Sequence, residues 1–539
     1  MMPTDTPMTP LAFLERSALV WPEQIAAVDG DRRMTYAEAA DHVTRLAHGL
    51  TGLGLEPGDR VAYLAPNSME VLWSHFAVPL AGGVLVTINT RLAAEEVRYI
   101  LEHSGAKVVM VAPELWEQLA SIKDRTPVQA VVMLPDADGT SAPVEGTIDY
   151  TGLIASGSAE PIPWEVDDED ATISINYTSG TTGRPKGVMY THRGAYLNSL
   201  NQVIHQGFSR SSVYLWTLPM FHCNGWCTAW AVTAMAGTHV CLRAVRGPDI
   251  WRLVGQEGVT HLCGAPTVLS IMAADQGAHR LDPPVTVTTA GAAPSPTIIE
   301  KFNALNASLR HVYGLTETYG PYTVCEMRPE WAELDPAALA VQMARQGVSM
   351  VAADRVRVID TMHPDADELV DVPSDGATMG EIVMRGNITM KGYFNDPEAT
   401  DEAFRGGWFH SGDLGVIHPH GYVQLLDRAK DVIVSGGENI STVEVEQAIL
   451  RHEGVTDVAV IGVPDPRWGE VPKAFVVLAA GEQATPEEII AHVKTRIAKY
   501  KAPKHVEIVA ELPKTATGKI RKHELRDKEW AGRDSKIQG

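Results

Sequence analysis

Residues 177–187 read YTSGTTGRPKG and follow directly on the apolar run Ile173 to Tyr177. Glycines let backbone N–H groups come close to an anion, the hydroxyl side chains add donors, and Lys186 adds a positive charge. The stretch therefore predicts a strand followed by a phosphate-holding loop. It is not a Walker A loop, because Pro185 precedes the lysine and Gly187 follows it. The alternative is a flexible Gly/Thr turn, which eleven residues of this composition disfavour.

Short apolar runs alternate with helical patterns on both sides of this loop. Strands are predicted at Arg60 to Leu64, Val84 to Ile88 and Lys107 to Val111, with helices near 69–79 and 94–103. A second alternating block contains the glycine-rich loop and the apolar runs at 213–218 and 285–290. Such alternation indicates parallel sheets covered by helices. We therefore expect an α/β fold with two doubly wound sheets.

The composition changes in the last third of the chain. From residue 354 short strands and turns predominate, which predicts a β-rich, distorted barrel-like subdomain at about 354–427. The charged residues 428–431 follow, and then strands at 455–462 and 473–478 with a helical pattern at 486–501. We expect an N-terminal domain at 1–427, a charged junction at 428–431, which the resemblance named below makes a hinge, and a small α+β domain at 432–539.

Charge and cysteine content exclude several classes of function. The chain has 67 acidic and 45 basic side chains, a net charge of −22, which argues against a nucleic-acid partner. No apolar run is long enough to span a membrane, and neither terminus carries a recognisable targeting signal, so we expect a cytoplasmic protein. The five cysteines are predicted to be reduced and buried. Cys223 and Cys227 lack a second pair at zinc-binding spacing.

Three further segments contain candidate functional residues. In YGLTET (313–318) an aromatic face, a hydroxyl and a carboxylate suit a base, a phosphate and Mg²⁺. In WFHSGD (408–413) Asp413 could accept from two ribose hydroxyls. In PKTATGKIRK (513–522) small residues surround Lys519 and would let its ammonium reach a cleft in another domain. Taken singly, each segment also fits a solvated turn, a turn-capping Asp or a basic tail.

Together, these segments and the junction 427–439 resemble the ordered core motifs of the adenylate-forming enzymes, which include acyl-CoA synthetases, luciferases and peptide-synthetase adenylation domains. The resemblance covers essentially the whole chain. It implies that a carboxylate attacks the α-phosphorus of MgATP to give acyl-adenylate and pyrophosphate, and that a thiol then displaces AMP. The implied cofactors are ATP, Mg²⁺ and coenzyme A.

The resemblance also implies roles for individual residues. The implied contacts of the β- and γ-phosphates are the loop residues Thr178, Ser179, Gly180, Thr181, Thr182, Gly183 and Lys186. Thr316 would contact the α-phosphate, and Glu317 with Thr178 would hold Mg²⁺. The implied contacts of adenine are Tyr313 and the backbone of Gly291, Ala292 and Ala293; those of ribose are Asp413 and Arg428; and Gly314 is a further cofactor contact. Lys519 would bridge the ribose and the attacking carboxylate. The C-terminal domain would rotate about Lys430 and open a thiol tunnel lined by Gly436, Gly437 and Glu438.

The segment PMFHCNGWC (219–227) is predicted to be the end of a core strand and the start of a helix. Aromatic packing in the core would explain it equally well. The resemblance makes it the carboxylate end of the acyl pocket, formed by His222, Asn224, Gly225 and Trp226 with Gly291, and makes His222 catalytic together with Thr316 and Lys519. The segment is similar to the corresponding segment of short- or medium-chain and aryl acyl-CoA ligases, methylthiopropionate-CoA ligases among them.

We therefore expect an AMP-forming acid–thiol ligase that acts on a small carboxylic acid, ATP and CoA. A close alternative is an adenylation enzyme that loads a carrier-protein thiol in trans. A kinase or ATPase is disfavoured by the missing Walker A lysine, and a catalytically inactive nucleotide sensor by the joint presence of Glu317, Asp413 and Lys519. A homodimer is also expected, since some relatives pair through their N-terminal domains.

Overall fold

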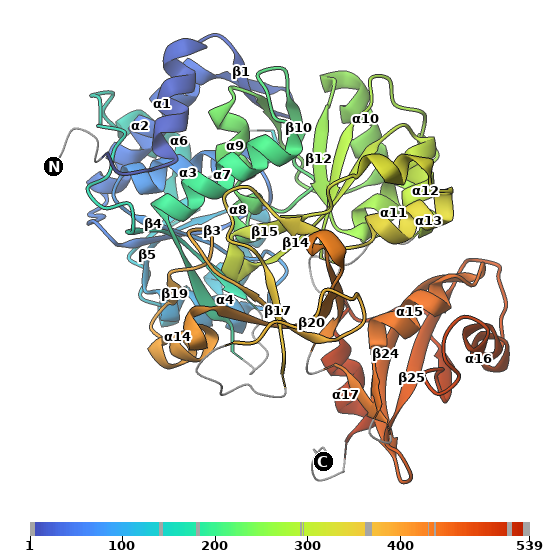
Figure 1. The fold of residues 1–539 in the computed structure, drawn as a ribbon. Helices are drawn as coiled ribbons and strands as arrows, with labels where there is room; N and C mark the ends of the chain where they lie inside the picture. Colours follow the sequence, from blue (N-terminus) through green and yellow to red (C-terminus); the bar gives the residue numbers. More distant parts are fainter. Residues whose placement is uncertain are drawn as a thin grey trace.

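The computed structural model describes residues 6–138, 144–178, 184–291, 294, 296–361, 369–428, 431–435, 438–514 and 520–531. The chain forms a large α/β body and a smaller α+β unit built from the C-terminal residues, drawn in orange and red in Figure 1. The expected fold class is confirmed. Across the described residues, no helix is sufficiently long and apolar to span a membrane.

An eight-stranded sheet contains the strands on either side of the glycine-rich loop, in the order β19-β9-β8-β4-β3-β5-β6-β7. Its strands are β3 (Arg60–Leu64), β4 (Val84–Thr87), β5 (Ala106–Val111), β6 (Ala130–Met133), β7 (Ile148–Asp149), β8 (Thr172–Thr178), β9 (Lys186–Thr191) and β19 (Gly392–Tyr393). The expected grouping of the loop with the second block is wrong. Strand β8 pairs in parallel with β4, so the loop belongs to the first sheet.

A nine-stranded sheet forms the other half of the body, in the order β16-β15-β14-β13-β12-β10-β11-β1-β2. Its strands are β1 (Ile25–Asp29), β2 (Arg32–Thr35), β10 (Val213–Leu215), β11 (Thr238–Val240), β12 (His261–Gly264), β13 (Thr286–Thr289), β14 (Ser308–Leu315), β15 (Gly320–Val324) and β16 (Val348–Ser349). Strands β10 to β14 are parallel, as the alternating pattern predicts.

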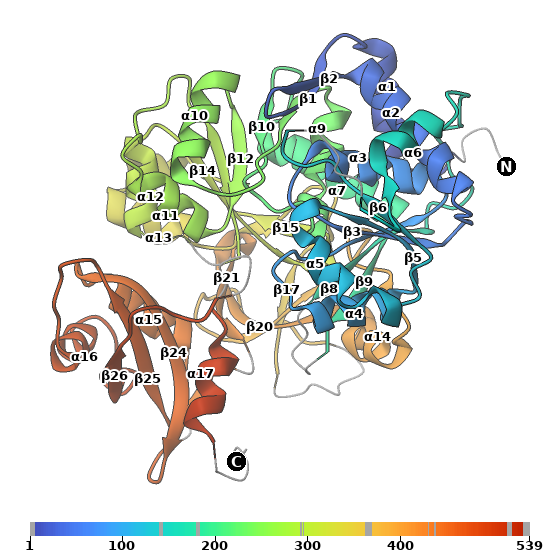
Figure 2. The same cartoon turned by 180° about the vertical axis from the view of Figure 1, so that it is seen from behind.

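Helices cover both sheets. They are α1 (Leu11–Val20), α2 (Tyr36–Gly52), α3 (Met69–Leu80), α4 (Ala94–Ser104), α5 (Trp116–Ala120), α6 (Tyr150–Ser156), α7 (His192–Gln206), α9 (Thr228–Ala234), α10 (Gly247–Glu257), α11 (Pro266–Ala274), α12 (Pro296–Ala304), α13 (Pro336–Met343) and α14 (Pro397–Ala403). Side chains of β3 alternate between two cores: Ala62 and Leu64 pack with α4 and α5 on the face seen in Figure 2, while Val61 and Tyr63 pack with α2 and α3. Helix α2 begins at a capping box of Thr35 and Glu38.

A four-stranded antiparallel sheet links the body to the C-terminal unit. Its strands, in the order β17-β18-β20-β21, are β17 (Arg357–Ile359), β18 (Gly380–Met384), β20 (Phe409–Ile417) and β21 (Val423–Arg428). The C-terminal unit contains β22 (Ile433–Ser435), β23 (Glu438–Ile440), α15 (Thr442–Leu450), β24 (Val455–Asp465), β25 (Gly469–Leu478), α16 (Pro486–Lys494), β26 (His505–Ile508) and α17 (Lys522–Glu529). Helix α16 ends seven residues before the predicted Lys501, which instead pairs with Glu444 of α15 at 2.7 Å.

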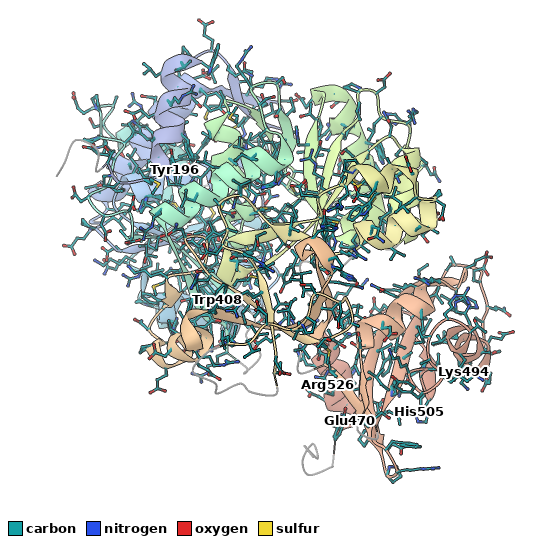
Figure 3. All side chains as sticks on the ribbon, viewed as in Figure 1. Tyr196, Trp408, Glu470, Lys494, His505 and Arg526 are labelled. Atoms are coloured by element: carbon teal, nitrogen blue, oxygen red, sulfur yellow. The ribbon has the colours of Figure 1, made fainter. Side chains whose placement is uncertain are left out.

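A buried charge cluster joins β21 to the C-terminal unit. The Asp427 carboxylate accepts from the Thr442 backbone N–H at 2.5 Å, at the start of α15. The Lys522 ammonium donates to Thr442 Oγ1 at 2.6 Å and pairs with Glu446 at 2.8 Å. One turn along α17, Arg526, which is labelled in Figure 3, pairs with Asp431. Cations of α17 thus neutralise acidic groups beside residues 428–431.

Replacing the buried cation should destabilise this junction. In Lys522→Met the carboxylates of Glu446 and Asp427 lose their positive neighbour, so we expect a loss of about 3–5 kcal/mol in unfolding free energy. Thermal and urea unfolding would measure it. Lys528→Met, on the exposed side of the same helix, is the matched control and should change stability by about 0.5 kcal/mol or less. Equal effects of the two substitutions would contradict the structural role of Lys522.

Candidate active site

The hairpin β8–β9 carries the glycine-rich loop. Thr178 and Lys186 are register partners at the end of the hairpin where the loop connects the two strands, which is the carboxyl end of β8. That end is where ligands bind in open α/β sheets. Five predicted phosphate contacts lie outside the described residues, namely Ser179, Gly180, Thr181, Thr182 and Gly183.

Lys186 and Glu317 are connected through Tyr393, a residue that the sequence reasoning missed. The Lys186 ammonium lies over the Tyr393 ring, 4.7 Å from its centroid. The Tyr393 hydroxyl donates to Glu317 Oε1 at 2.9 Å. The predicted phosphate cation and the predicted metal ligand therefore contact the same aromatic side chain. A cavity of about 380 Å³ also borders Lys186, and Arg184 and His103 line it.

Glu317 lies in the turn between β14 and β15, and hydrogen bonds from neighbouring segments fix this turn. Its carbonyl accepts from Met390 N at 2.7 Å, and the carbonyl of Thr316 accepts from the Tyr190 hydroxyl of β9 at 2.7 Å. Burial raises the pKa of the Glu317 carboxyl, and the Tyr393 hydroxyl opposes this. A carboxylate is a ligand that a hard cation such as Mg²⁺ prefers. In the described part of the chain, no group of three or more His, Cys, Asp and Glu side chains could hold a metal ion.

The predicted adenine and ribose residues are in direct contact. The Tyr313 hydroxyl donates to Asp413 Oδ2 at 2.7 Å, and Arg428 Nε pairs with Asp413 Oδ1 at 2.9 Å. Asp413 and Arg428 are partners across β20 and β21. Gly314 follows at a bulge in β14, where a Cβ atom would lie 1.9 Å from the Gly320 carbonyl oxygen, so only glycine fits.

The start of strand β20, which carries Asp413, is fixed by cations on an aromatic ring. Trp408, labelled in Figure 3, lies just before β20, and the guanidinium groups of Arg357 and Arg385 lie over its ring at 4.8 and 4.4 Å from the centroid. His410 then contacts the Glu381 carboxylate of β18 at 2.8 Å. The motif 408–413 thus positions its aspartate through contacts to two neighbouring strands.

A helix does start in 219–227 as predicted, but its first turn is left-handed. Cys223, Asn224, Gly225, Trp226 and Cys227 have φ values of 51°, 49°, 58°, 57° and 62°, so the chain makes a left-handed turn (labelled α8, Cys223–Trp226, in Figure 1) before the right-handed α9 begins. Left-handed conformation costs roughly 1–2 kcal/mol for each non-glycine residue. Contacts outside the turn must therefore hold it, as is common at functional sites.

Buried hydrogen bonds attach this turn to β8. Asn224 Oδ1 accepts from Ser174 Oγ and from Asn176 Nδ2, both at 2.7 Å, and all three side chains are buried. Ser174 and Asn176 belong to the strand that leads into the glycine-rich loop. The predicted acid pocket and the predicted phosphate loop are thus joined through one strand.

Close packing completes the turn on its other sides. A Cβ atom on Gly225 would lie 2.3 Å from the Trp216 ring, and a Cβ atom on Gly320 would lie 2.7 Å from the Trp226 ring. Trp226 is 6% exposed. Because Gly225 and Gly320 have no side chain, the indole rings of Trp216 and Trp226 can pack directly against them. The Trp226 ring thus lies against β15, the strand that follows Glu317.

The Cys223 thiol connects the turn to Thr316, donating to Thr316 Oγ1 at 3.5 Å. Burial raises the pKa of this thiol, but His222 and the hydroxyls of Thr316 and Tyr190 outweigh burial, so the pKa lies below its ordinary value. His222 therefore interacts with Cys223 at the edge of the turn. All five cysteines are free and buried, as expected.

The remaining predicted residues are only partly described. Gly291 is exposed after β13 with φ of 89°. Glu438 begins β23, but its side chain is not described. Six residues lie outside the described ranges: Ala292, Ala293, Lys430, Gly436, Gly437 and Lys519.

Comparison with known proteins identifies the family. The family model described as "AMP-binding enzyme" matches residues 14–394, and the one described as "AMP-binding enzyme C-terminal domain" matches 444–519. The chain belongs to the AMP-binding enzyme family. The expected acyl-CoA synthetase relationship, the acid–thiol ligase class and the use of ATP, Mg²⁺ and CoA are confirmed.

Individual relatives match along almost their whole length. An acetate–CoA ligase of Humulus lupulus is 43% identical, with 97% of this chain and 95% of that one covered. A 4-hydroxybutyrate–CoA ligase of Metallosphaera sedula is 43% identical, with 96% and 94% covered. The solved structure of the anthranilate CoA ligase AuaEII in complex with anthranoyl-AMP is 25% identical, with a TM-score of 0.85 and 98% and 99% covered.

The left-handed turn of this AMP-binding enzyme should not tolerate a side chain at Gly225. In Gly225→Ala the new methyl group meets Trp216, and a further non-glycine residue must adopt positive φ, so we expect a loss of about 2–5 kcal/mol in unfolding free energy. Thermal unfolding would measure the loss.

Gly255→Ala is the control for this substitution. Gly255 lies inside α10, and a Cβ atom there would have no other atom within 4 Å, so alanine should stabilise the protein by about 0.5–1 kcal/mol. An unchanged melting temperature in Gly225→Ala would contradict the described geometry of the turn.

Proposed function

We propose that this enzyme is an ATP-dependent acyl-CoA ligase that activates a short- or medium-chain carboxylic acid, methylthio- or aryl-substituted acids included, through an acyl-adenylate. AMP and pyrophosphate are released. The contact between Cys223 and Thr316 carries the proposal. It joins the turn assigned to the acid to the residue assigned to the α-phosphate, and a carboxylate that attacks the α-phosphorus needs these two sites side by side.

The groups around Thr316 suit the first half-reaction. Lys186 would hold the phosphates that leave, while Asp413 and Arg428 would hold the ribose. Glu317 and Thr178 would hold Mg²⁺, which when bound neutralises phosphate charge. The Trp226 ring, packed on Gly320, would limit the length of the acyl group.

The acids named for the relatives support a small substrate. Acetate, 4-hydroxybutyrate and anthranilate are the acids in the names of the three relatives described above. A hydrophobic pocket separates neighbouring chain lengths by about 1–3 kcal/mol per methylene. We therefore propose a preference among small acids and not strict selection of one.

The second half-reaction is assigned to the C-terminal unit. We propose that residues 432–539 form a lid that turns about 428–431 relative to 1–427, presents Lys519 for adenylation, and opens the CoA path beside Gly436, Gly437 and Glu438. The Asp427–Thr442 hydrogen bond and the Arg526–Asp431 ion pair lie at that boundary and support it. The cytoplasmic location and the homodimer stay predictions.

Pyrophosphate release across a panel of acids tests the proposed reaction. The panel runs from acetate to dodecanoate and adds benzoate, cinnamate and methylthiopropionate, with ATP, Mg²⁺ and free CoA present. We expect equal amounts of AMP, pyrophosphate and acyl-CoA, with the highest kcat/KM for a small acid. Release of ADP and phosphate, or adenylate formation with no acyl-CoA from free CoA, would contradict the proposal.

Lys519→Ala separates the two half-reactions. We expect adenylate formation to fall by about 10²-fold or more, because a preformed donor to the developing charge is lost. Conversion of supplied acyl-adenylate and CoA to thioester should remain near the wild-type rate. Adenylation at the wild-type rate would show that the assignment of Lys519 is wrong.

A further inference from the structure

Tyr393 lies between two residues that the proposed function assigns to MgATP. It is on β19, which pairs in antiparallel fashion with β9, so that Tyr393 faces Val188 two residues after Lys186. Its hydroxyl reaches across to the Glu317 carboxylate at 2.9 Å. One side chain thus connects the phosphate hairpin of the first sheet to the β14–β15 turn of the second.

The hydroxyl bond fixes the direction of the Glu317 carboxylate. With Oε1 accepting from Tyr393, rotation of the carboxyl group would break a partly buried hydrogen bond, which costs more than breaking one fully exposed to water. The backbone of the same segment holds the glutamate too, because Met390 N donates to the Glu317 carbonyl at 2.7 Å. Glu317 is therefore held by residues 390–393 at both its main chain and its side chain.

The ring of the same tyrosine supports the Lys186 ammonium. The distance of 4.7 Å from Nζ to the ring centroid is within the range of a cation–π contact. The backbone N–H of Tyr393 donates to Thr400 Oγ1 of α14 at 2.9 Å, which holds the main chain that carries the ring. The ammonium and the carboxylate therefore have a common support.

We propose that Tyr393 is a positioning residue that keeps the Glu317 carboxylate and the Lys186 ammonium in one fixed arrangement for the metal and the phosphates of MgATP. The inference rests on the proposed function. Partners of a metal-ligating carboxylate commonly change metal affinity 10- to 100-fold when they are removed. Tyr393 would act through Glu317 and Lys186 and touch neither the acid nor CoA.

Equilibrium binding of ATP in the absence of acid tests this role. Isothermal titration calorimetry of the full chain would give the ATP Kd over a series of MgCl₂ concentrations and in EDTA. In Tyr393→Phe the ring stays under Lys186 and only the hydroxyl is lost. Mg²⁺ lowers the ATP Kd, and we expect the Mg²⁺ concentration that gives half of this effect to rise about tenfold in Tyr393→Phe. The ATP Kd measured in EDTA should stay unchanged. In Tyr393→Leu the Kd in EDTA should also rise, about threefold.

Two further variants make the outcomes distinct. Tyr422→Phe removes another tyrosine hydroxyl, one bonded to the Glu326 carbonyl at 2.8 Å, and should leave both Kd values and the Mg²⁺ dependence unchanged. Glu317→Gln should shift the Mg²⁺ dependence at least as far as Tyr393→Phe. If Glu317→Gln shifts it and Tyr393→Phe does not, the role of Tyr393 is wrong. If Glu317→Gln has no effect, the metal assignment within the proposed function is wrong, and the inference falls with it.

Discussion

Two buried hydrogen bonds, from Ser174 and Asn176 to one oxygen of Asn224, are the constraint on which the site depends. They compensate for part of the cost of five consecutive left-handed residues and tie that turn to β8. The glycine-rich loop leaves the end of the same strand. A shift of the turn would therefore also displace β8, the strand that leads into the predicted phosphate loop. The acid and nucleotide ends of the site are thus both positioned by β8.

Three sheets contribute residues to the site, and each brings a different kind of group. The eight-stranded sheet brings Lys186 and Tyr393, the nine-stranded sheet brings Thr316 and Glu317, and the four-stranded sheet brings Asp413 with Arg428. Hydrogen bonds of Tyr393 to Glu317 and of Tyr313 to Asp413 cross between the sheets. The residues far apart in sequence are therefore held by short polar contacts across sheet boundaries.

Local patterns predict much of this architecture. The strand at Arg60–Leu64 follows from the alternating pattern, and the family that the motifs resemble is the one that the family models match. The pairing of β8 with β4 could not be predicted from the sequence, because an apolar run does not specify which strand it will pair with in a sheet. The handedness of Cys223–Trp226 could not be read either, since only tertiary contacts make it favourable. The sequence around Tyr393 did not indicate its role, because its partners Lys186 and Glu317 lie in distant segments of the chain.

The left-handed turn has a consequence for exchanging acid pockets between relatives. In a turn of this hand, successive side chains rotate about the axis in the opposite sense to those of an ordinary helix, so Trp226 reaches the face it occupies only while that hand is kept. The hand is held by Ser174 and Asn176, about 50 residues earlier in the chain. Residues 222–227 and strand β8 should therefore be exchanged together. If residues 222–227 alone were transferred to a relative, their side chains would lack the backbone conformation that orients them.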